Sequence, residues 1–310
     1  KKIRVVHLSD THNQHWCISS HMLPAGDLLL HTGDIVGNFE SRTNLVEHLQ
    51  SFLNWTIQVA FPKFDKVVFI GGNHDVILDH EQRGSQRNDV DVQQQTHAAC
   101  KMLTSFLSTY PKKVVYLENQ AYTYRSKFVI YGAPACMCRR EMMGLHYLSD
   151  GFERTRDERK EIWNMIPLHE VDILMTHVPP LLMNNHEKIK KGERRDTVMQ
   201  QICQVAGAEE KAGCDLLGRH VYGHILGKSI ELKGASNVSI HNEKGRTKSP
   251  LLHAFGHFHS GFGVASVVPS EKADGRQNFT GTILSNASQS DLFWIDSYGG
   301  AIPLVYDLYK

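Results

Sequence analysis

The sequence has no apolar run that approaches the roughly 20 residues of a membrane-spanning helix. It also shows neither a signal peptide nor a transit peptide, because Lys1 opens directly onto a short apolar run. A leader that had already been removed would leave no trace, and an initiator methionine is lacking. We therefore expect a cytoplasmic protein with no membrane partner.

The sequence has few cysteines and almost no net charge. The chain has 6 cysteines in 310 residues, at irregular spacing and without a C-x-x-C pair. Cys136 and Cys138 could form a redox pair or half of a metal site, but the pattern favours free thiols in a reducing compartment. A net charge of +1 offers no overall field for nucleic acid. No basic stripe is visible either, so we expect no nucleic-acid surface.

The residues that are present describe a soluble globular protein. Hydrophobic residues make up 41% of the chain and charged residues 22%. Expected strands at 3–8, 27–31 and 66–70 alternate with expected helices at 41–59 and 92–108, which favours a parallel sheet with crossover helices. The later part adds a hairpin and several further strands. This order fits an α/β sandwich of two mixed sheets.

Polar side chains follow the third expected strand at the point where it ends. Residues 67–72 form an apolar run that closes in two glycines, and Asn73, His74 and Asp75 come next. The glycines allow the backbone to turn sharply and to approach another group closely. An amide oxygen can bind a hard cation, and an imidazole can bind a metal or carry a proton. Alone, such a junction is most often an ordinary turn.

The same construction recurs at four other apolar runs, which makes chance a poor explanation. The polar residues at those strand ends are Asp10 with His12, Asp34, His177, and His257 with His259. In open α/β sheets, ligands bind beyond the carboxyl ends of the strands. We therefore expect these side chains to meet in space although they are far apart in the sequence.

Together, these carboxylates, imidazoles and an amide oxygen suit a cation such as Mn, Fe, Zn, Co or Ni, with no thiolate implied. The candidate metal ligands are Asp10, His12, Asp34, Asn73, His177, His257 and His259. They exceed the needs of one ion and would fill two sites if one carboxylate bridges. Two cations ~3.5–4 Å apart can clamp an in-line displacement at phosphorus and supply hydroxide from an acidified water. His74 is placed to give a proton to the leaving oxygen.

Five sequence blocks resemble the signature of calcineurin-like metallophosphoesterases. They are Asp10-x-His12, Gly33-Asp34, Gly72-Asn73-His74-Asp75, His177 and Gly256-His257-x-His259. Further segments, including Ser9 to His12, residues 130–134 and residues 172–180, resemble the metallophosphoesterase-domain (MPPED) branch. The blocks occur in order and span nearly the whole chain.

The resemblance implies a fold, a reaction and a role for each matching residue. The fold would be a four-layer α/β/β/α sandwich of two mixed sheets, as one domain over 1–310. Asp10, His12 and His259 would hold the first metal, Asn73, His177 and His257 the second, and Asp34 would bridge them as a catalytic residue. His74 would contact phosphate and protonate the leaving group. Members of this branch hydrolyse phosphodiesters, including cyclic nucleotides, usually with manganese, so we expect a small-molecule phosphoester substrate such as a nucleotide.

Three alternatives stay open beside the phosphodiesterase. A protein Ser/Thr phosphatase is disfavoured because that class carries Asp-Arg-Gly shortly after the Gly-Asp pair, whereas Gly33-Asp34 is followed here by Ile-Val-Gly-Asn. A phosphomonoesterase would use the same metal chemistry. A non-catalytic scaffold could keep the fold, although no candidate ligand is replaced in this sequence by a residue that cannot bind metal.

The chain departs from the branch pattern in several places. Residues 184–250 differ in composition and read as an insertion, within which we expect a helix at 196–206 and a structural or exposed His224. Asp75 stands where the branch usually has Glu. The loop at 136–148 replaces an aromatic one, and whether its Arg139 or Arg140 contacts substrate stays open.

The remaining histidines are interpreted by their position in the expected elements. His7 and His31 lie inside strands, so we expect them in the core or behind the ligands. His15 and His21 lie in a polar loop, and we expect both to be exposed to solvent.

Overall fold

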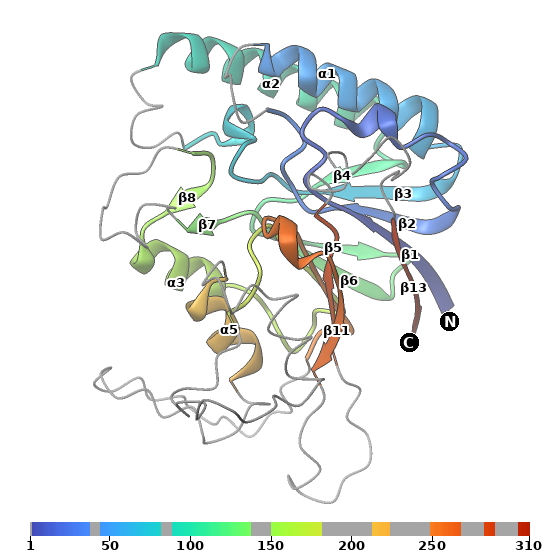
Figure 1. The fold of residues 1–310 in the computed structure, drawn as a ribbon, viewed down its shortest axis with the longest axis vertical. Coiled ribbons are helices and arrows are strands. Elements are labelled where there is room, and N and C mark those ends of the chain that lie inside the picture. Colours follow the sequence, from blue (N-terminus) through green and yellow to red (C-terminus); the bar gives the residue numbers. More distant parts are fainter. Residues whose placement is uncertain are drawn as a thin grey trace, which may run out of the picture.

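Two β-sheets pack face to face in the computed structural model, with helices on both outer surfaces (Figure 1). The structure describes residues 2–37, 44–81, 89–137, 150–181, 213–223, 249–267, 282–288 and 303–310. This arrangement confirms the predicted α/β sandwich of two mixed sheets. Among the helices of these ranges, none is long and apolar enough to cross a membrane.

The first sheet has the strand order β13-β1-β2-β3-β4. Its strands are β1 (Lys2–Leu8), β2 (Gly26–His31), β3 (Phe64–Phe69), β4 (Val114–Tyr116) and β13 (Leu304–Tyr309). Strands β1 to β4 run parallel, as the alternation of strands and helices predicts. β13 pairs antiparallel with β1 and makes the sheet mixed.

The second sheet has the order β11-β12-β10-β9-β6-β5. Its strands are β5 (Gln120–Tyr124), β6 (Phe128–Ala133), β9 (Ile173–Thr176), β10 (Leu252–Phe255), β11 (Gly263–Val267) and β12 (Thr282–Asn286). The inner strands are parallel, while β5 and β11 pair antiparallel at the two edges. A separate two-stranded ribbon joins β7 (Cys136–Met137) to β8 (Glu153–Arg154).

Alternating side chains on the inner strands build two hydrophobic cores. Leu28 and Leu30 of β2 face Ile173 and Met175 of β9 in the core between the sheets. Leu29, between the two leucines in the sequence, points the other way into the core under the helices. This is the period-two pattern of strands buried on both faces. It fixes the register of each strand, and so fixes where the residues after the strand emerge.

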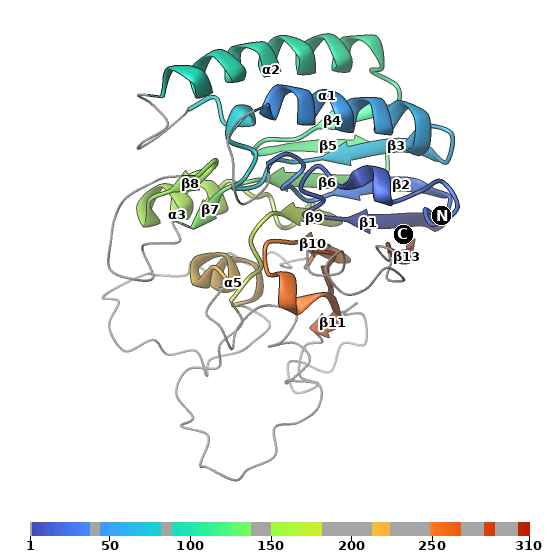
Figure 2. The same ribbon diagram turned by 45° about the horizontal axis from the view of Figure 1, so that its top comes forward.

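Helices cover the outer faces of both sheets (Figure 2). On the first sheet lie α1 (Leu45–Trp55), which continues as a π-helical turn η2 (Thr56–Ala60), and α2 (Val90–Thr109). On the second lie α3 (Arg156–Asn164) and α5 (Asp215–Tyr222). Short 3-10 helices follow three of the site loops: η1 (His15–Cys17), η3 (Val76–Leu78) and η6 (His259–Gly261).

The helix starts follow from local capping. The Asp89 carboxylate accepts hydrogen bonds from the backbone N–H groups of Asp91 and Val92 at the start of α2. Thr155 and Glu158 form a reciprocal capping box at the start of α3.

Two sequence predictions meet a different local structure. α5 lies within the range predicted to be an insertion, yet its Leu217 and Val221 are buried in the core. The helix predicted at 196–206 lies outside the described residues, and the insertion boundaries stay a prediction.

The prediction that His15 is exposed is wrong. Its ring is buried against Phe52 and Trp55, because η1 folds the polar loop down onto α1.

Candidate metal centre

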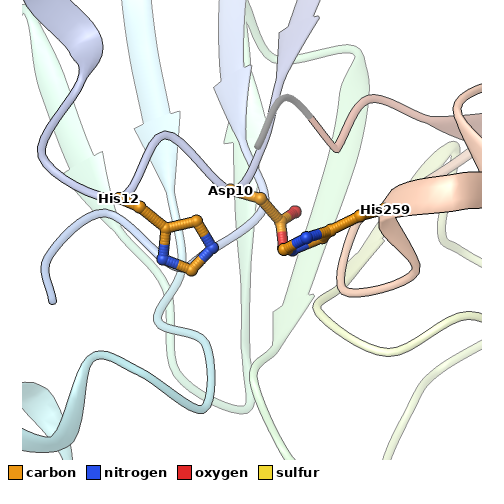
Figure 3. Close-up of side chains that lie close together, drawn as sticks. All are labelled: Asp10, His12 and His259. Atoms are coloured by element: carbon orange, nitrogen blue, oxygen red, sulfur yellow. The ribbon is translucent and has the colours of Figure 1, made fainter. Parts of the chain in front are cut away.

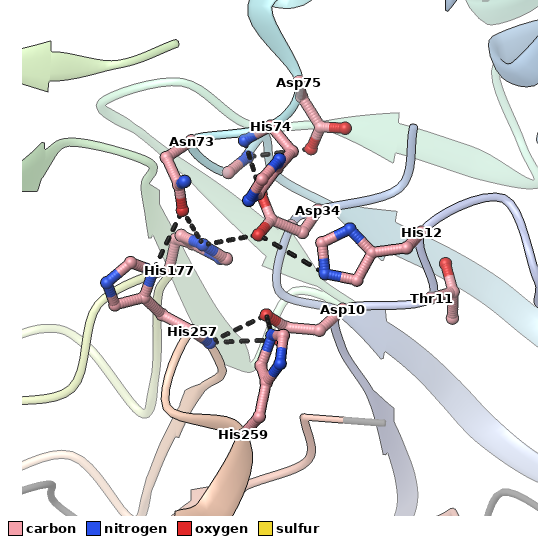
Figure 4. Close-up of polar contacts among 12 residues, drawn as sticks. Asp10, Thr11, His12, Asp34, Asn73, His74, Asp75, His177, His257 and His259 are labelled. Atoms are coloured by element: carbon pink, nitrogen blue, oxygen red, sulfur yellow. Dashed lines mark hydrogen bonds and ion pairs between the residues drawn. The ribbon is translucent and has the colours of Figure 1, made fainter. Parts of the chain in front are cut away.

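The loops after five parallel strands deliver polar side chains to one edge of the sandwich (Figure 4). β1 delivers Asp10 and His12, β2 delivers Asp34, β3 delivers Asn73 and His74, β9 delivers His177, and β10 delivers His257 and His259. Every residue that the sequence predicts for the site therefore lies in this cluster.

Several of these residues have left-handed backbone conformations, which are uncommon outside glycine. The φ angles are 53° at Asp10, 42° at His12, 55° at Asp34 and 65° at His257. Such conformations cost on the order of 1–3 kcal/mol each and persist only where the surrounding structure holds them. Here the backbone N–H of Asp10 donates to the Gly33 carbonyl at 2.9 Å, and that of His12 to the Asp34 carbonyl at 2.9 Å. Four of the seven candidate ligands thus have a left-handed backbone that neighbouring loops hold in place.

The first group of donor atoms comes from Asp10, His12 and His259 (Figure 3). One donor atom from each lies within 4.8 Å of the other two. The His259 Nε2 and Asp10 Oδ1 atoms are 3.2 Å apart. An oxygen and two nitrogens at this spacing can close around one cation.

The second group comes from Asp34, His177 and His257, again within 4.8 Å. The amide oxygen of Asn73 joins it, because it lies 3.0 Å from His177 Nε2 and 2.9 Å from His257 Nδ1. The distance from His177 Nε2 to Asp34 Oδ2 is 3.3 Å.

Asp34 lies between the two groups. Its Oδ2 atom is 3.3 Å from His177 Nε2 in the second group and 3.8 Å from His12 Nε2 in the first. Its other oxygen accepts a hydrogen bond from the His74 backbone N–H at 2.8 Å. The carboxylate is therefore oriented so that one oxygen faces both groups.

The electrostatics of the cluster suit a divalent cation. Burial opposes ionisation of Asp34, but the neighbouring His177 and His74 imidazoles hold its pKa well below the usual range. Burial lowers the pKa of His12 and of His257 to about 4, so both rings are neutral at pH 7 and keep a lone pair. Burial would also lower the pKa of His177, but the Asp34 carboxylate raises it to about 9. That shift shows how strongly the carboxylates favour positive charge at this point.

The absence of a side chain at Gly72 leaves room for two of the candidate ligands. A Cβ atom at Gly72 would lie 2.3 Å from Asp34 Oδ1 and 2.7 Å from His177 Cε1. A side chain there would displace the Asp34 carboxylate and the His177 ring. The donors are oxygens and nitrogens, the set preferred by Mn, Fe, Zn, Co or Ni. The residues present thus fit a pair of divalent cations.

Two supporting contacts hold the ligands and their loops in place. The His177 Nδ1–H donates to the Thr32 carbonyl at 2.8 Å, which leaves Nε2 to face the donor group. The Asp75 carboxylate accepts from the backbone N–H groups of Ile35, Val36 and Gly72 at 2.8–2.9 Å. Asp75 thereby ties the β2 loop to the β3 loop. A backbone carbonyl such as that of Thr32 could not have been identified from residue types.

His74 has a different position from the ligands. Its ring centroid is 4.9 Å from that of His12, and it is only partly buried. Among the described residues it belongs to neither group of donor atoms. Arg139, Arg140 and His224 lie outside the described residues.

Comparison with known proteins identifies the family. The family model for calcineurin-like phosphoesterases matches residues 3–227, which contain most of the candidate ligands. The chain belongs to the calcineurin-like phosphoesterase family.

Relatives of this chain include proteins from animals. It is 26% identical over 267 residues to Metallophosphoesterase domain-containing protein 1 of Homo sapiens, covering 84% of this chain and 62% of that protein. It is 28% identical over 180 residues to UPF0046 protein K07C11.7 of Caenorhabditis elegans, covering 58% of this chain and 52% of that one. The chain thus spans about half to three fifths of the length of these curated relatives. The crystal structure of TT1561 of Thermus thermophilus shares the fold, with a TM-score of 0.50 and 9% identity over 93% of this chain and 89% of that one.

Proposed function

We propose that this chain is a binuclear-metal-dependent phosphodiesterase whose substrate is a small phosphodiester such as a cyclic nucleotide. The observation that carries the proposal is the position of the Asp34 carboxylate, with one oxygen facing both groups of donor atoms. The motif resemblance to the MPPED branch favours a diester over a monoester.

Each side chain has a part in this proposal. Asp10, His12 and His259 would hold one cation, Asn73, His177 and His257 would hold the other, and Asp34 would reach both. When bound, two divalent cations supply Lewis-acid stabilisation of the phosphoryl oxygens and lower the pKa of a water toward neutrality. We favour manganese because the branch that the motifs resemble usually uses it, and the donor set of carboxylate, imidazole and amide oxygen is compatible with it.

His74 would act on the leaving group. Its backbone N–H is bound to Asp34 Oδ1, which fixes the loop that presents the imidazole. The ring lies close to the His12 ring, at the side of the donor groups, where it can reach an oxygen that departs from phosphorus. An imidazole there can protonate that oxygen as it leaves.

The test is a substrate panel with a matched pair of variants. The protein is stripped with chelator, reloaded with manganese, and assayed against aryl diesters, aryl monoesters and cyclic nucleotides. We expect about two manganese ions per chain and a clear preference for a diester. Asp34→Asn should be nearly inactive. Asp27→Asn should keep its activity, because Asp27 lies at the start of β2, away from the loop that carries Asp34, and contacts Arg4 and Arg125.

The other outcomes separate the alternatives. A preference for aryl monoesters would identify a phosphomonoesterase. Metal content near zero, with no turnover of any ester, would identify a non-catalytic scaffold. Full activity of Asp34→Asn in chelator would overturn the metal-dependent mechanism.

A further inference from the structure

Two threonines, Thr32 and Thr176, support His177. Its Nδ1–H donates to the carbonyl of Thr32, on the β2 loop. On its own chain it follows Thr176, the last residue of β9. The side chains of Thr32 and Thr176 each continue into a chain of buried hydrogen bonds.

The first of these, the Tyr306 chain, crosses the core between the sheets. The Tyr306 hydroxyl donates to Ser285 Oγ at 2.5 Å, and Ser285 Oγ lies 2.6 Å from His7 Nδ1. The other nitrogen, His7 Nε2, lies 2.9 Å from Thr32 Oγ1. Since Ser285 accepts from Tyr306, its own proton is available to His7 Nδ1, and we assign it there. His7 then carries its proton on Nε2 and donates it to Thr32.

The second, the Tyr222 chain, comes from α5. The Thr176 hydroxyl donates to the Val178 carbonyl at 2.8 Å, so its oxygen is left to accept. The neighbouring nitrogen is His253 Nε2, at 2.9 Å, which must therefore carry the proton. His253 Nδ1 then accepts from the Tyr222 hydroxyl at 2.7 Å. This chain has the same order of groups as the first: a tyrosine hydroxyl, an imidazole with its proton on Nε2, and a threonine oxygen.

Both imidazoles are completely buried, and burial lowers the pKa of each to about 3. Each ring is therefore neutral and has one proton, which the tyrosine side of the chain directs to Nε2. No donor atom of His7 or His253 belongs to either candidate metal group in the described residues. A role as metal ligands is therefore not their explanation.

We propose that His7 and His253 are positioning residues for His177. The Tyr306 chain fixes Thr32, whose carbonyl orients the His177 ring, and the Tyr222 chain fixes Thr176, from which His177 extends. The inference rests on the proposed function, because the orientation of His177 matters to activity only if its Nε2 binds a metal. It also assigns a role to α5 and β13, which contribute no ligand themselves.

The experiment measures manganese affinity rather than turnover. Metal-free wild type, Thr32→Val and Thr176→Val are titrated with manganese by calorimetry. The valine variants keep side-chain shape but remove the oxygen that accepts from His7 or His253. Loss of a group that orients a ligand typically weakens metal binding about 10–100-fold. We expect that loss for one of the two ions, with the other unchanged, and no additional effect of Thr32→Val in a His177→Ala background.

The matched control is Tyr124→Phe. Tyr124 also donates its hydroxyl to a group on another strand, Asp65 Oδ2 at 2.6 Å, but it lies on the edge strand β5. Both manganese affinities should stay at the wild-type values. Should the valine variants fail to fold, Tyr306→Phe and Tyr222→Phe serve instead, with an expected weakening of about fivefold, the size of one net hydrogen bond.

A second readout does not involve metal. Imidazole ¹⁵N spectra of the metal-free protein should show His7 and His253 neutral, each with its proton on Nε2. Wild type that binds no manganese would remove the proposed function and this inference together. Wild type that binds two ions, with unchanged affinities in both valine variants, would overturn this inference alone.

Discussion

At the scale of single residues, the site separates the groups that can hold metal from the group that can deliver a proton. The candidate ligands are mostly buried, and four of them, including Asp10 and Asp34, have a left-handed backbone. His74 is partly buried and has an ordinary φ angle. This division predicts that ligand variants change metal content, whereas His74 variants change turnover.

His74→Ala should lower kcat by about 10²–10⁴-fold without changing the manganese content, because general acid catalysis is typically worth that much. The loss should depend on the leaving group. An aryl diester whose phenolate leaving group is a weak base needs little protonation, so its kcat should fall least. An alkyl diester has a strongly basic leaving group, so its kcat should fall most. The measurement is kcat against leaving-group pKa for both proteins. An equal loss across the whole series would contradict the acid role.

Gly72→Ala should weaken metal binding. The new methyl group would lie 2.5 Å from the Asp34 backbone nitrogen as well as 2.3 Å from its Oδ1 atom, so the loop or the ligand must move. Gly26→Ala is the matched control, since a Cβ there meets its neighbours at 3.1–3.3 Å. Calorimetric titration with manganese should show at least a roughly tenfold weaker affinity in the first variant. Wild-type affinity in Gly72→Ala would show that the donor groups are looser than described.

At the scale of elements, a buried ion pair fixes the loop that carries Asn73. Arg154 of the β7–β8 ribbon donates from both terminal nitrogens to the Asp79 carboxylate, at 2.9 and 3.0 Å. Asp79 also accepts from the Phe152 backbone N–H at 2.7 Å. Next to this contact, the Gly151 N–H donates to the Asn73 carbonyl at 2.8 Å. The ribbon therefore supports the second donor group from outside.

Arg154→Met should reduce the free energy of unfolding by about 3–5 kcal/mol, because it leaves the buried Asp79 carboxylate without its partner. The double variant Arg154→Met with Asp79→Asn should be less destabilised than the single one, since a neutral amide still accepts from Phe152. Urea unfolding of the three proteins measures the difference. If the double variant is as unstable as the single one, the uncompensated charge is not the cause.

At the scale of the whole molecule, buried neutral histidines make stability depend on pH. Burial lowers the pKa of His7, His31 and His253 from 6.5 to about 3. Between pH 6.5 and 3 the unfolded chain therefore binds more protons than the folded one. The stabilisation is fully present above pH 6.5 and is lost as the pH falls toward 3.

We expect the free energy of unfolding to fall with decreasing pH in this window by up to about 1.4 kcal/mol per pH unit for each such histidine. His253→Phe removes one titrating group while keeping a flat ring beside Tyr222. Its unfolding should show a slope smaller by about that amount, whatever its stability at neutral pH. Urea unfolding at several pH values measures the slope. An unchanged slope in His253→Phe would mean that His253 is already charged in the folded chain.

The fold and the candidate ligands could be predicted because their signals are local. Each ligand directly follows an apolar run, and parallel strands bring such positions to one edge whatever lies between them. The contacts between His7 and Ser285 could not be predicted, since the residues are 278 positions apart and neither type is unusual in a strand. The sequence did not predict α5, because this helix has only 8 residues and lies within a polar stretch. The exposure of His15 was predicted wrongly, because its ring is buried by Phe52 and Trp55 and not by its own loop.

The order in which the donors occur along the chain constrains how the ions can be acquired. Asp10, His12 and Asp34 come from the first sheet, whereas His177, His257 and His259 come from the second. Both proposed cations would therefore draw donors from both sheets, so a complete donor set exists only once the two sheets have docked. The free energy of binding two cations would then add to the stability of the docked sandwich, because the undocked chain lacks the formed site.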